Sequence, residues 1–113
     1  MTQLNDMTAA YIECIDFTDS EALESAESFS EQAKASARDS CAEFLRHYSE
    51  SAPQFDAAQL GHDLWLTRNG HGVGFWDRPE IYGATLADEY SRYSEFVGAQ
   101  DAYTGDDNLI YIA

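Results

Sequence analysis

Residues 61–78 read Gly61-His62-Asp63-Leu64-Trp65-Leu66-Thr67-Arg68-Asn69-Gly70-His71-Gly72-Val73-Gly74-Phe75-Trp76-Asp77-Arg78. Leu64 and Leu66 alternate with residues of other kinds, which is the period-2 pattern typical of a strand. The dipeptide Asn69-Gly70 follows, and it favours a two-residue hairpin turn because both positions tolerate positive φ. The segment therefore predicts a β-hairpin over residues 62–77.

The chain after this segment alternates again between helix and strand signals. Thr85-Leu86-Ala87-Asp88 has the form of a capping box and predicts a helix near 85–98 that Gly98 ends. An Asp-rich turn at 105–108 then precedes a short C-terminal strand at 109–112.

The chain before this segment has helical periodicity. The first amphipathic stripe consists of Met7, Tyr11, Cys14 and Ile15. A second stripe runs over 22–48, and Pro53 ends it. This second stripe fits either one long helix or two helices with a break near 28–30, and the pattern leaves both open.

The fold class that these elements predict is α+β. We expect N-terminal amphipathic helices packed on a small antiparallel sheet built around the 62–77 hairpin, with one helix near 85–98 and a short C-terminal strand. The 113 residues fit a single domain, 1–113. Its helical part covers about 1–52, and its hairpin, helix and strand part covers about 60–113.

The composition is strongly acidic. The chain has 21 Asp and Glu against 6 Lys and Arg, a net charge of −15, whereas a small domain usually carries a net charge of magnitude about 2–8. A DNA duplex as long as a globule of this size, about 34 Å, carries about 20 phosphates. Two explanations remain open: the surface mimics nucleic acid, or the charge serves solubility or adaptation to salt.

The position of the acidic residues favours mimicry, because no basic residue precedes Lys34. We expect the first helices to carry the negative face. Its predicted partner-binding residues are Glu13, Asp16, Glu24, Glu27, Glu31 and Asp39. The expected partner is a basic DNA-binding protein of the host, such as a restriction or CRISPR nuclease or uracil-DNA glycosylase, and direct nucleic-acid binding is disfavoured by the charge.

Residues 61–78 also resemble a segment of small, uncharacterised phage and prophage accessory proteins. The resemblance covers less than a fifth of the chain and carries no known activity. It implies a short accessory protein of a mobile element, and such proteins often inhibit host defence or repair enzymes. The resemblance thus implies an origin rather than an activity, and it favours an inhibitor that acts in the host cytoplasm.

The alternative function is a generic acidic interaction or structural protein that uses the hairpin as its contact surface. Its predicted partner-binding residues are Trp65, Arg68, Asn69, Trp76 and Arg78, because tryptophan and arginine dominate interface hot spots. Burial of at least one tryptophan in the core is the competing interpretation. A homodimer is left open.

The sequence predicts no enzyme, cofactor or metal site. His62 and Asp77 would be cross-strand neighbours, but no nucleophile is placed by a motif, and the histidines lack the spacing of known metal sites. Cys14 and Cys41 are expected as buried, reduced thiols, with a disulfide between packed helices as the alternative. No signal peptide or membrane span is visible in the sequence, so we expect a cytoplasmic protein.

Overall fold

The computed structural model describes residues 2–18 and 28–113. The first helix, α1, spans Gln3–Thr18. The residues that its apolar stripe predicts to be internal are all buried: Met7, Tyr11, Cys14 and Ile15. The first predicted helix is therefore confirmed. Thr18 is the last residue of α1.

In the second helical stripe, the described residues form a short strand first, and a helix begins only after it. Strand β1 spans Ser28–Phe29, and helix α3 spans Glu31–His47. Between them Ser30 is the N-cap, and its Oγ accepts a hydrogen bond from the amide of Ala33 at 3.0 Å. The break near 28–30 is thus real. A short 3₁₀ turn, η1, follows α3 at Ala52–Gln54.

The predicted hairpin at 62–77 is wrong, because its first half is helical. Helix α4 spans Ala57–Arg68, with Asp56 as an N-cap that accepts a hydrogen bond from Gln59 N at 3.1 Å. Asn69 ends the helix, and Gly70 has φ +65°. The amides of Gly70 and His71 donate to the carbonyls of Thr67 and Leu66, which is the Schellman arrangement of a helix end.

The second half of the expected hairpin is a loop with a single 3₁₀ turn, η2, at Phe75–Asp77. Helix α5 then spans Pro79–Val97, with a kink at Gly83. Gly98 ends it with φ +85°. The predicted helix near 85–98 is therefore confirmed, although α5 starts at Pro79 rather than near 85, at a proline suited to a first helical position.

The sheet is small and of mixed direction. Strands β2, Ala102–Thr104, and β3, Leu109–Ile112, pair antiparallel, and β1 pairs with β3 in parallel, giving the order β1-β3-β2. The C-terminal strand is confirmed, whereas the purely antiparallel sheet is not. Gln32 connects α3 to the sheet, because its side-chain amide donates a hydrogen bond to Ile112 O at 2.6 Å and accepts one from Ile112 N at 3.0 Å.

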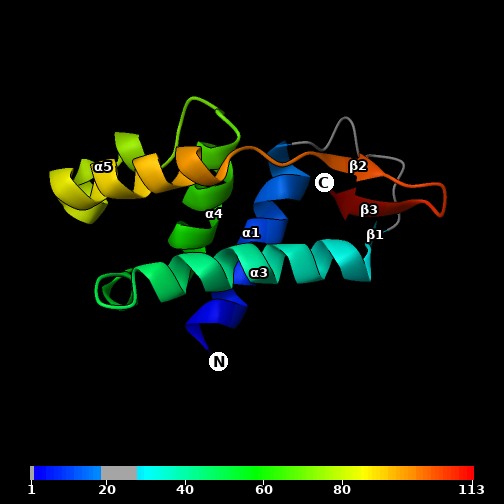
Figure 1. Cartoon of the computed structure of the whole chain (residues 1–113), viewed down its shortest axis with the longest axis horizontal. Helices are drawn as coiled ribbons and strands as arrows, with labels where there is room; N and C mark the ends of the chain where they lie inside the picture. Colours follow the sequence, from blue (N-terminus) through cyan, green and yellow to red (C-terminus); the bar gives the residue numbers. More distant parts are fainter. Residues whose placement is uncertain (1, 19–27) are drawn as a thin grey trace.

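The arrangement is α+β, with helices predominant in the described chain. Figure 1 shows α3 and α5 running along the long axis, with α1 and α4 crossing between them and the sheet at one end. The molecule measures 43 × 29 × 20 Å. An aromatic cluster fills the space between α3, α5 and the 3₁₀ turns, with the rings of Phe44 and Phe75 stacked at 5.5 Å. Within the described residues, the helices are all too short or too polar to span a membrane.

Candidate partner-binding site

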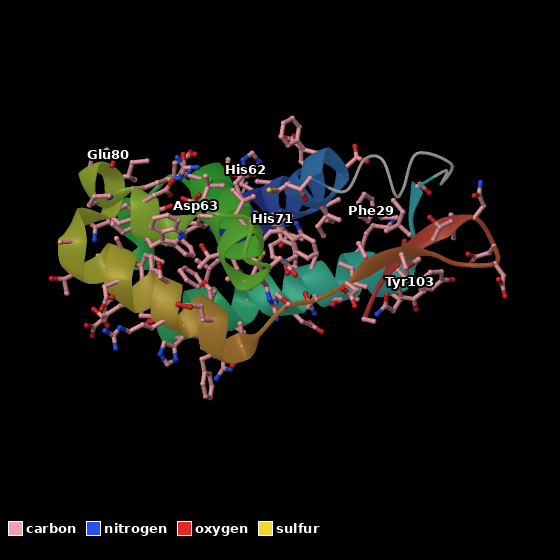
Figure 2. The ribbon with its side chains drawn as sticks, turned by 90° about the horizontal axis from the view of Figure 1, so that it is seen from above. Phe29, His62, Asp63, His71, Glu80 and Tyr103 are labelled. Atoms are coloured by element: carbon pink, nitrogen blue, oxygen red, sulfur yellow. The ribbon has the colours of Figure 1, made fainter. Side chains whose placement is uncertain are left out.

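A buried carboxylate, Asp63, organises the 61–78 segment. Its side chain is 0% exposed. Oδ1 accepts a hydrogen bond from Arg78 Nε at 2.8 Å, and Oδ2 accepts from Tyr82 Oη at 2.6 Å and from Gln59 Nε2 at 2.9 Å. The hydrogen bond to Asp63 raises the pKa of Arg78, while burial and the nearby carboxylate raise the pKa of Tyr82. Figure 2 shows Asp63 on α4, beside α5. Because its hydrogen bonds join α4 to Arg78 and Tyr82, the Asp63 carboxylate stabilises the fold.

Arg68 is likewise engaged inside the protein. Its Nε donates to Gly98 O at 2.7 Å, and its Nη1 donates to Tyr11 Oη at 3.1 Å and to Ser40 Oγ at 2.9 Å. These bonds join the C-terminal end of α4 to α1, to α3 and to the end of α5. The Arg68 guanidinium therefore links four helices through hydrogen bonds, and it has little freedom to contact a partner.

The residues of the alternative hairpin surface are separated by the fold. Trp65 is 1% exposed and donates through Nε1 to Thr18 Oγ1 at 3.0 Å. Asn69 is half-buried and accepts from Gln100 N at 2.9 Å. Since Arg68 and Arg78 are engaged internally, Trp76, at 55% exposed, is the member of that set that remains open to a partner. The interpretation that one tryptophan packs in the core is confirmed.

The predicted acidic face is distributed over two crossing helices. Glu13 and Asp16 lie on α1, Glu31 and Asp39 lie on α3, and all four are exposed. Glu31 pairs with Lys34 at 2.5 Å. Asp39 lines a hollow between α3, α4 and α5 that also contains Arg68. The two other predicted members, Glu24 and Glu27, lie outside the described residues.

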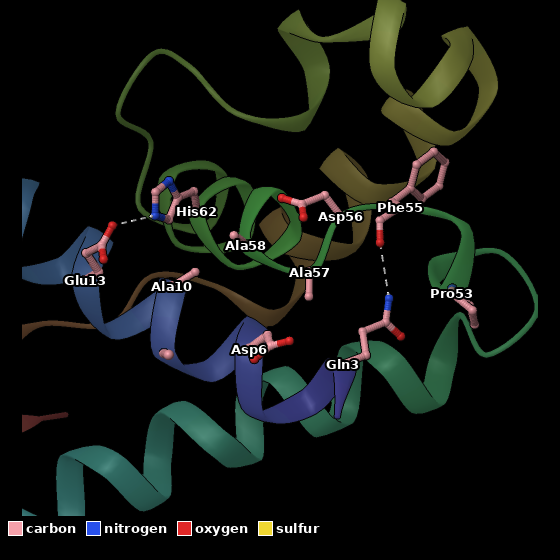
Figure 3. Close-up of a pocket in the computed structure, with 11 residues that line it drawn as sticks. Gln3, Asp6, Ala10, Glu13, Pro53, Phe55, Asp56, Ala57, Ala58 and His62 are labelled. Carbon is pink, nitrogen blue, oxygen red and sulfur yellow. Dashed lines mark hydrogen bonds and ion pairs between the residues drawn. The ribbon is translucent and has the colours of Figure 1, made fainter. Parts of the chain in front are cut away.

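Glu13 belongs to a groove of about 740 Å³ between α1 and the start of α4. Figure 3 shows the carboxylates of Asp6, Glu13 and Asp56 along this groove, with His62 at one end. His62 Nε2 lies 3.5 Å from Glu13 Oε1. The groove is lined by three carboxylates and one imidazole ring, and the carboxylates would attract a cationic side chain.

The predicted hairpin register places His62 beside Asp77, but the structure separates the two residues. His62 lies on α4 and faces α1, whereas Asp77 accepts a hydrogen bond from Gly74 N at 2.9 Å. Asp56 lines the groove as well, although it is not among the predicted site residues. The sequence contains a signal for Asp56, because an Asp directly before a helix start is a typical N-cap. That signal can be recognised only if a helix is predicted to start at Ala57.

Carboxylates greatly outnumber cationic side chains at the surface of this protein. The six Lys and Arg side chains each have a partner within the chain, and four of these partners are carboxylates: Glu31, Glu43, Asp63 and Asp88. Among the described acidic residues, all but Asp6, Asp63 and Asp77 are exposed. Among the described residues, most of the exposed carboxylates therefore have no Lys or Arg side chain paired with them.

Metal-ligating side chains are not gathered in this part of the protein: in residues 2–18 and 28–113, no three His, Cys, Asp or Glu side chains are grouped as a metal ion would require. Comparison of the chain with models of known protein families, with curated proteins and with solved structures finds no match in any of the three.

Proposed function

We propose that this chain is a non-enzymatic acidic decoy that binds a basic, DNA-handling protein of the host cell. Its exposed carboxylates would take the places of DNA phosphates in the partner's binding cleft. The observation that carries the proposal is the excess of exposed carboxylates: each Lys and Arg side chain has a hydrogen-bond or ion-pair partner within the chain, and most of the described carboxylates face solvent without such a partner. Such a surface attracts a cationic cleft over long range.

The dimensions support the same function. A duplex as long as the protein's 43 Å axis carries about 25 phosphates, and the chain has 21 acidic residues. The charge per length of the protein is thus of the same order as that of DNA. A partner that recognises phosphate position and density, rather than base edges, would find comparable contacts here.

The groove between α1 and α4 gives this surface a concave binding position. Asp6, Glu13 and Asp56 line it, and an inserted Lys or Arg side chain would contact carboxylates on two helices. Glu13, a predicted member of the acidic face, lies at this groove. We therefore assign Glu13 and its neighbours on α1 as the centre of the decoy surface.

The resemblance of residues 61–78 to phage and prophage accessory proteins supports a defence or repair enzyme as the target. The contacts of Asp63, Arg68 and Trp65 support a structural role for most of that segment. The distinctive segment would then mark a common scaffold, and the acidic surface on it would carry the function.

The test is capture of partners from host lysate on the immobilised chain, with elution by salt and by duplex DNA. We expect a basic DNA-binding enzyme to be retained at low salt and released by either treatment. The diagnostic variant neutralises four residues of the acidic face: Glu13→Gln, Asp16→Asn, Glu31→Gln and Asp39→Asn. The matched control removes the same charge elsewhere on the exposed surface: Glu80→Gln, Glu89→Gln, Asp101→Asn and Asp106→Asn.

Retention should fall at least tenfold in the first variant and by much less in the control. Equal loss in both variants would mean that net charge alone attracts the protein, without a defined face. A partner whose retention resists both salt and DNA would contradict the decoy function. That result would favour the second candidate, an interaction protein centred on exposed Trp76.

A further inference from the structure

We propose that the pocket at the turn between β2 and β3 binds an arginine side chain of a partner protein. The pocket has a volume of about 480 Å³, and residues of both strands and of their turn line it: Tyr103, Thr104, Gly105, Asp106, Asp107 and Tyr111. Figure 2 shows Tyr103 at the sheet, away from His62. The lining residues of the acidic groove and of this pocket are all different, so the inference goes beyond the proposed function.

Two tyrosine rings form the apolar part of the pocket. Tyr103 and Tyr111 lie opposite each other on paired strands, and their rings are stacked at 5.8 Å with an angle of 21° between their planes. Tyr103 is 48% exposed, so part of its surface is free to contact a ligand. The face of an aromatic ring carries partial negative charge and therefore attracts a cation.

The charge of the pocket selects the same occupant. Asp106 and Asp107 are both exposed. In the part of the chain that the structure describes, each of the six Lys and Arg side chains bonds to a group elsewhere, and none of them lines this pocket. The two carboxylates and the rings therefore lack a cation of this chain. A second copy is disfavoured, because it also carries a net charge of −15.

The turn holds the pocket in one shape. Tyr111 Oη donates a hydrogen bond to Asp107 Oδ2 at 2.5 Å, and Asp107 Oδ1 accepts one from Leu109 N at 3.1 Å. A Cβ at Gly105 would lie 2.6 Å from Tyr111 Cε1, so the ring packs directly against the glycine. The hydrogen bond between their side chains lowers the pKa of Asp107 and raises the pKa of Tyr111. A pocket that is already formed costs less entropy on binding.

Arginine fits this pocket better than lysine. Its guanidinium is planar, so it can stack on an aromatic ring while its N–H groups donate to carboxylates. The pocket offers both contacts, since Tyr103 provides the ring and Asp106 an exposed carboxylate. Asp107 can add a further contact, because a carboxylate has about four acceptor positions. The ammonium of lysine is a strongly hydrated point charge without a flat face.

The probe for this site is the peptide acetyl-Gly-Arg-Gly-amide, titrated into the isotope-labelled full-length chain and followed by NMR. The titration is done at 0.15 M salt, where charges more than about 8 Å apart are largely screened. Two matched peptides replace the arginine by lysine or by citrulline, which has the same shape without the charge. We expect the arginine peptide to shift the ring signals of Tyr103 and Tyr111 and the amides of 105–107 until they saturate. The lysine peptide should bind about threefold more weakly, and the citrulline peptide should cause no shift.

The variants separate the contribution of the ring from that of the charge. Tyr103→Leu should weaken arginine-peptide binding about threefold, the effect of one exposed cation–π contact. Tyr103→Phe keeps the ring and should bind as the parent chain does. Asp106→Asn should also weaken binding, whereas its matched control, Asp101→Asn, removes the same charge at an exposed position outside the pocket and should have little effect. Circular dichroism and melting would verify that each variant folds.

The two neutralised four-residue variants distinguish this pocket from the acidic groove. The variant of the acidic face should lose its lysate partner and still bind the arginine peptide. The control variant contains Asp106→Asn, so it should keep most of the partner and bind the peptide more weakly. Equal binding of the arginine and citrulline peptides, or shifts spread over the carboxylates of α1 and α3, would overturn the proposal. A lysine peptide that binds as tightly as the arginine peptide would overturn it in favour of a site for any cation.

Discussion

Asp63 places a carboxylate inside the protein, where an unpaired charge is costly and a paired one is sensitive to the loss of its partner. The side chain holds together Gln59 and two residues far along the chain, Arg78 and Tyr82. We expect Asp63→Asn to lower the free energy of unfolding by about 3 kcal/mol, the lower end of the range for breaking a buried pair, because Arg78 is partly exposed. Urea unfolding followed by circular dichroism measures this loss.

The control for this prediction is Asp88→Asn. Asp88 pairs with Arg92 at 2.9 Å on the exposed side of α5, where such a pair contributes about 0.3–0.5 kcal/mol. A loss for Asp63→Asn as small as that for Asp88→Asn would show that the buried network adds little to stability.

Cys41 gives a prediction about pH at the same scale. Burial raises the pKa of its thiol to about 12, so the reactive thiolate is nearly absent at pH 8. With Cys14 replaced by Ala, we expect Ellman's reagent to modify Cys41 at least a hundredfold more slowly in the folded protein than in 6 M guanidinium chloride. Because the unfolded thiol ionises first, Cys41 should also lower stability as the pH rises from about 9 to about 12. Rapid modification of the folded protein at pH 8 would contradict its burial.

Helix α4 shows why part of the fold was beyond sequence analysis. Helix α1 and the helix near 85–98 were predictable because each has one apolar face. In contrast, α4 is buried on several sides, including Gly61, Asp63 and Trp65, so its residues show no single stripe at helical spacing. The Asn69-Gly70 signal was also ambiguous, because positive φ suits a helix end as well as a hairpin turn.

Gly61 gives the prediction that belongs to this pair of helices. A Cβ at Gly61 would lie 2.3 Å from the backbone oxygen of Met7 on α1, so Gly61→Ala must push α1 and α4 apart. The substitution favours an isolated helix by about 1 kcal/mol. We nevertheless expect a net loss of about 1–3 kcal/mol in unfolding free energy, as for overpacking, measured by thermal or urea unfolding.

The control is Ala58→Ser, at an exposed position of the same helix, which should change stability by about 0.5 kcal/mol or less. The acidic groove crosses the same contact between α1 and α4. Gly61→Ala should therefore also weaken partner capture, because it moves Glu13 relative to Asp56. Unchanged stability in Gly61→Ala would mean that the two helices can separate without cost.

At the scale of the whole molecule, the charge was predictable but its arrangement was not. Composition gives the net charge of −15, and the spacing along α1 indicates that Glu13 and Asp16 face solvent. The internal roles of Arg68 and Arg78 depend on contacts between residues 15 to 57 positions apart in sequence. Such contacts follow from the packing of α4. The incorrect hairpin placed Trp65 and Arg68 on one exposed surface, whereas the structure buries Trp65 and bonds Arg68 inside the protein.

The excess of carboxylates on the surface predicts how the melting temperature depends on salt. Carboxylates spread over a 43 Å molecule repel one another, and the repulsion is screened as the Debye length falls from about 30 Å at 0.01 M to about 3 Å at 1 M salt. We expect the melting temperature to rise with sodium chloride, by roughly 4 °C for each 1 kcal/mol of repulsion removed. Circular dichroism at 222 nm measures the effect.

The two four-residue neutralised variants separate stability from recognition. Each removes four negative charges, so both should melt higher at low salt and respond less to added salt than the parent chain. Only the variant of the acidic face should lose its partner. A melting temperature that does not rise with salt would contradict the repulsion. A chain that folds only near molar salt would indicate that the acidity is an adaptation to salt, whereas a chain folded at low salt retains its unscreened carboxylates for a cationic partner.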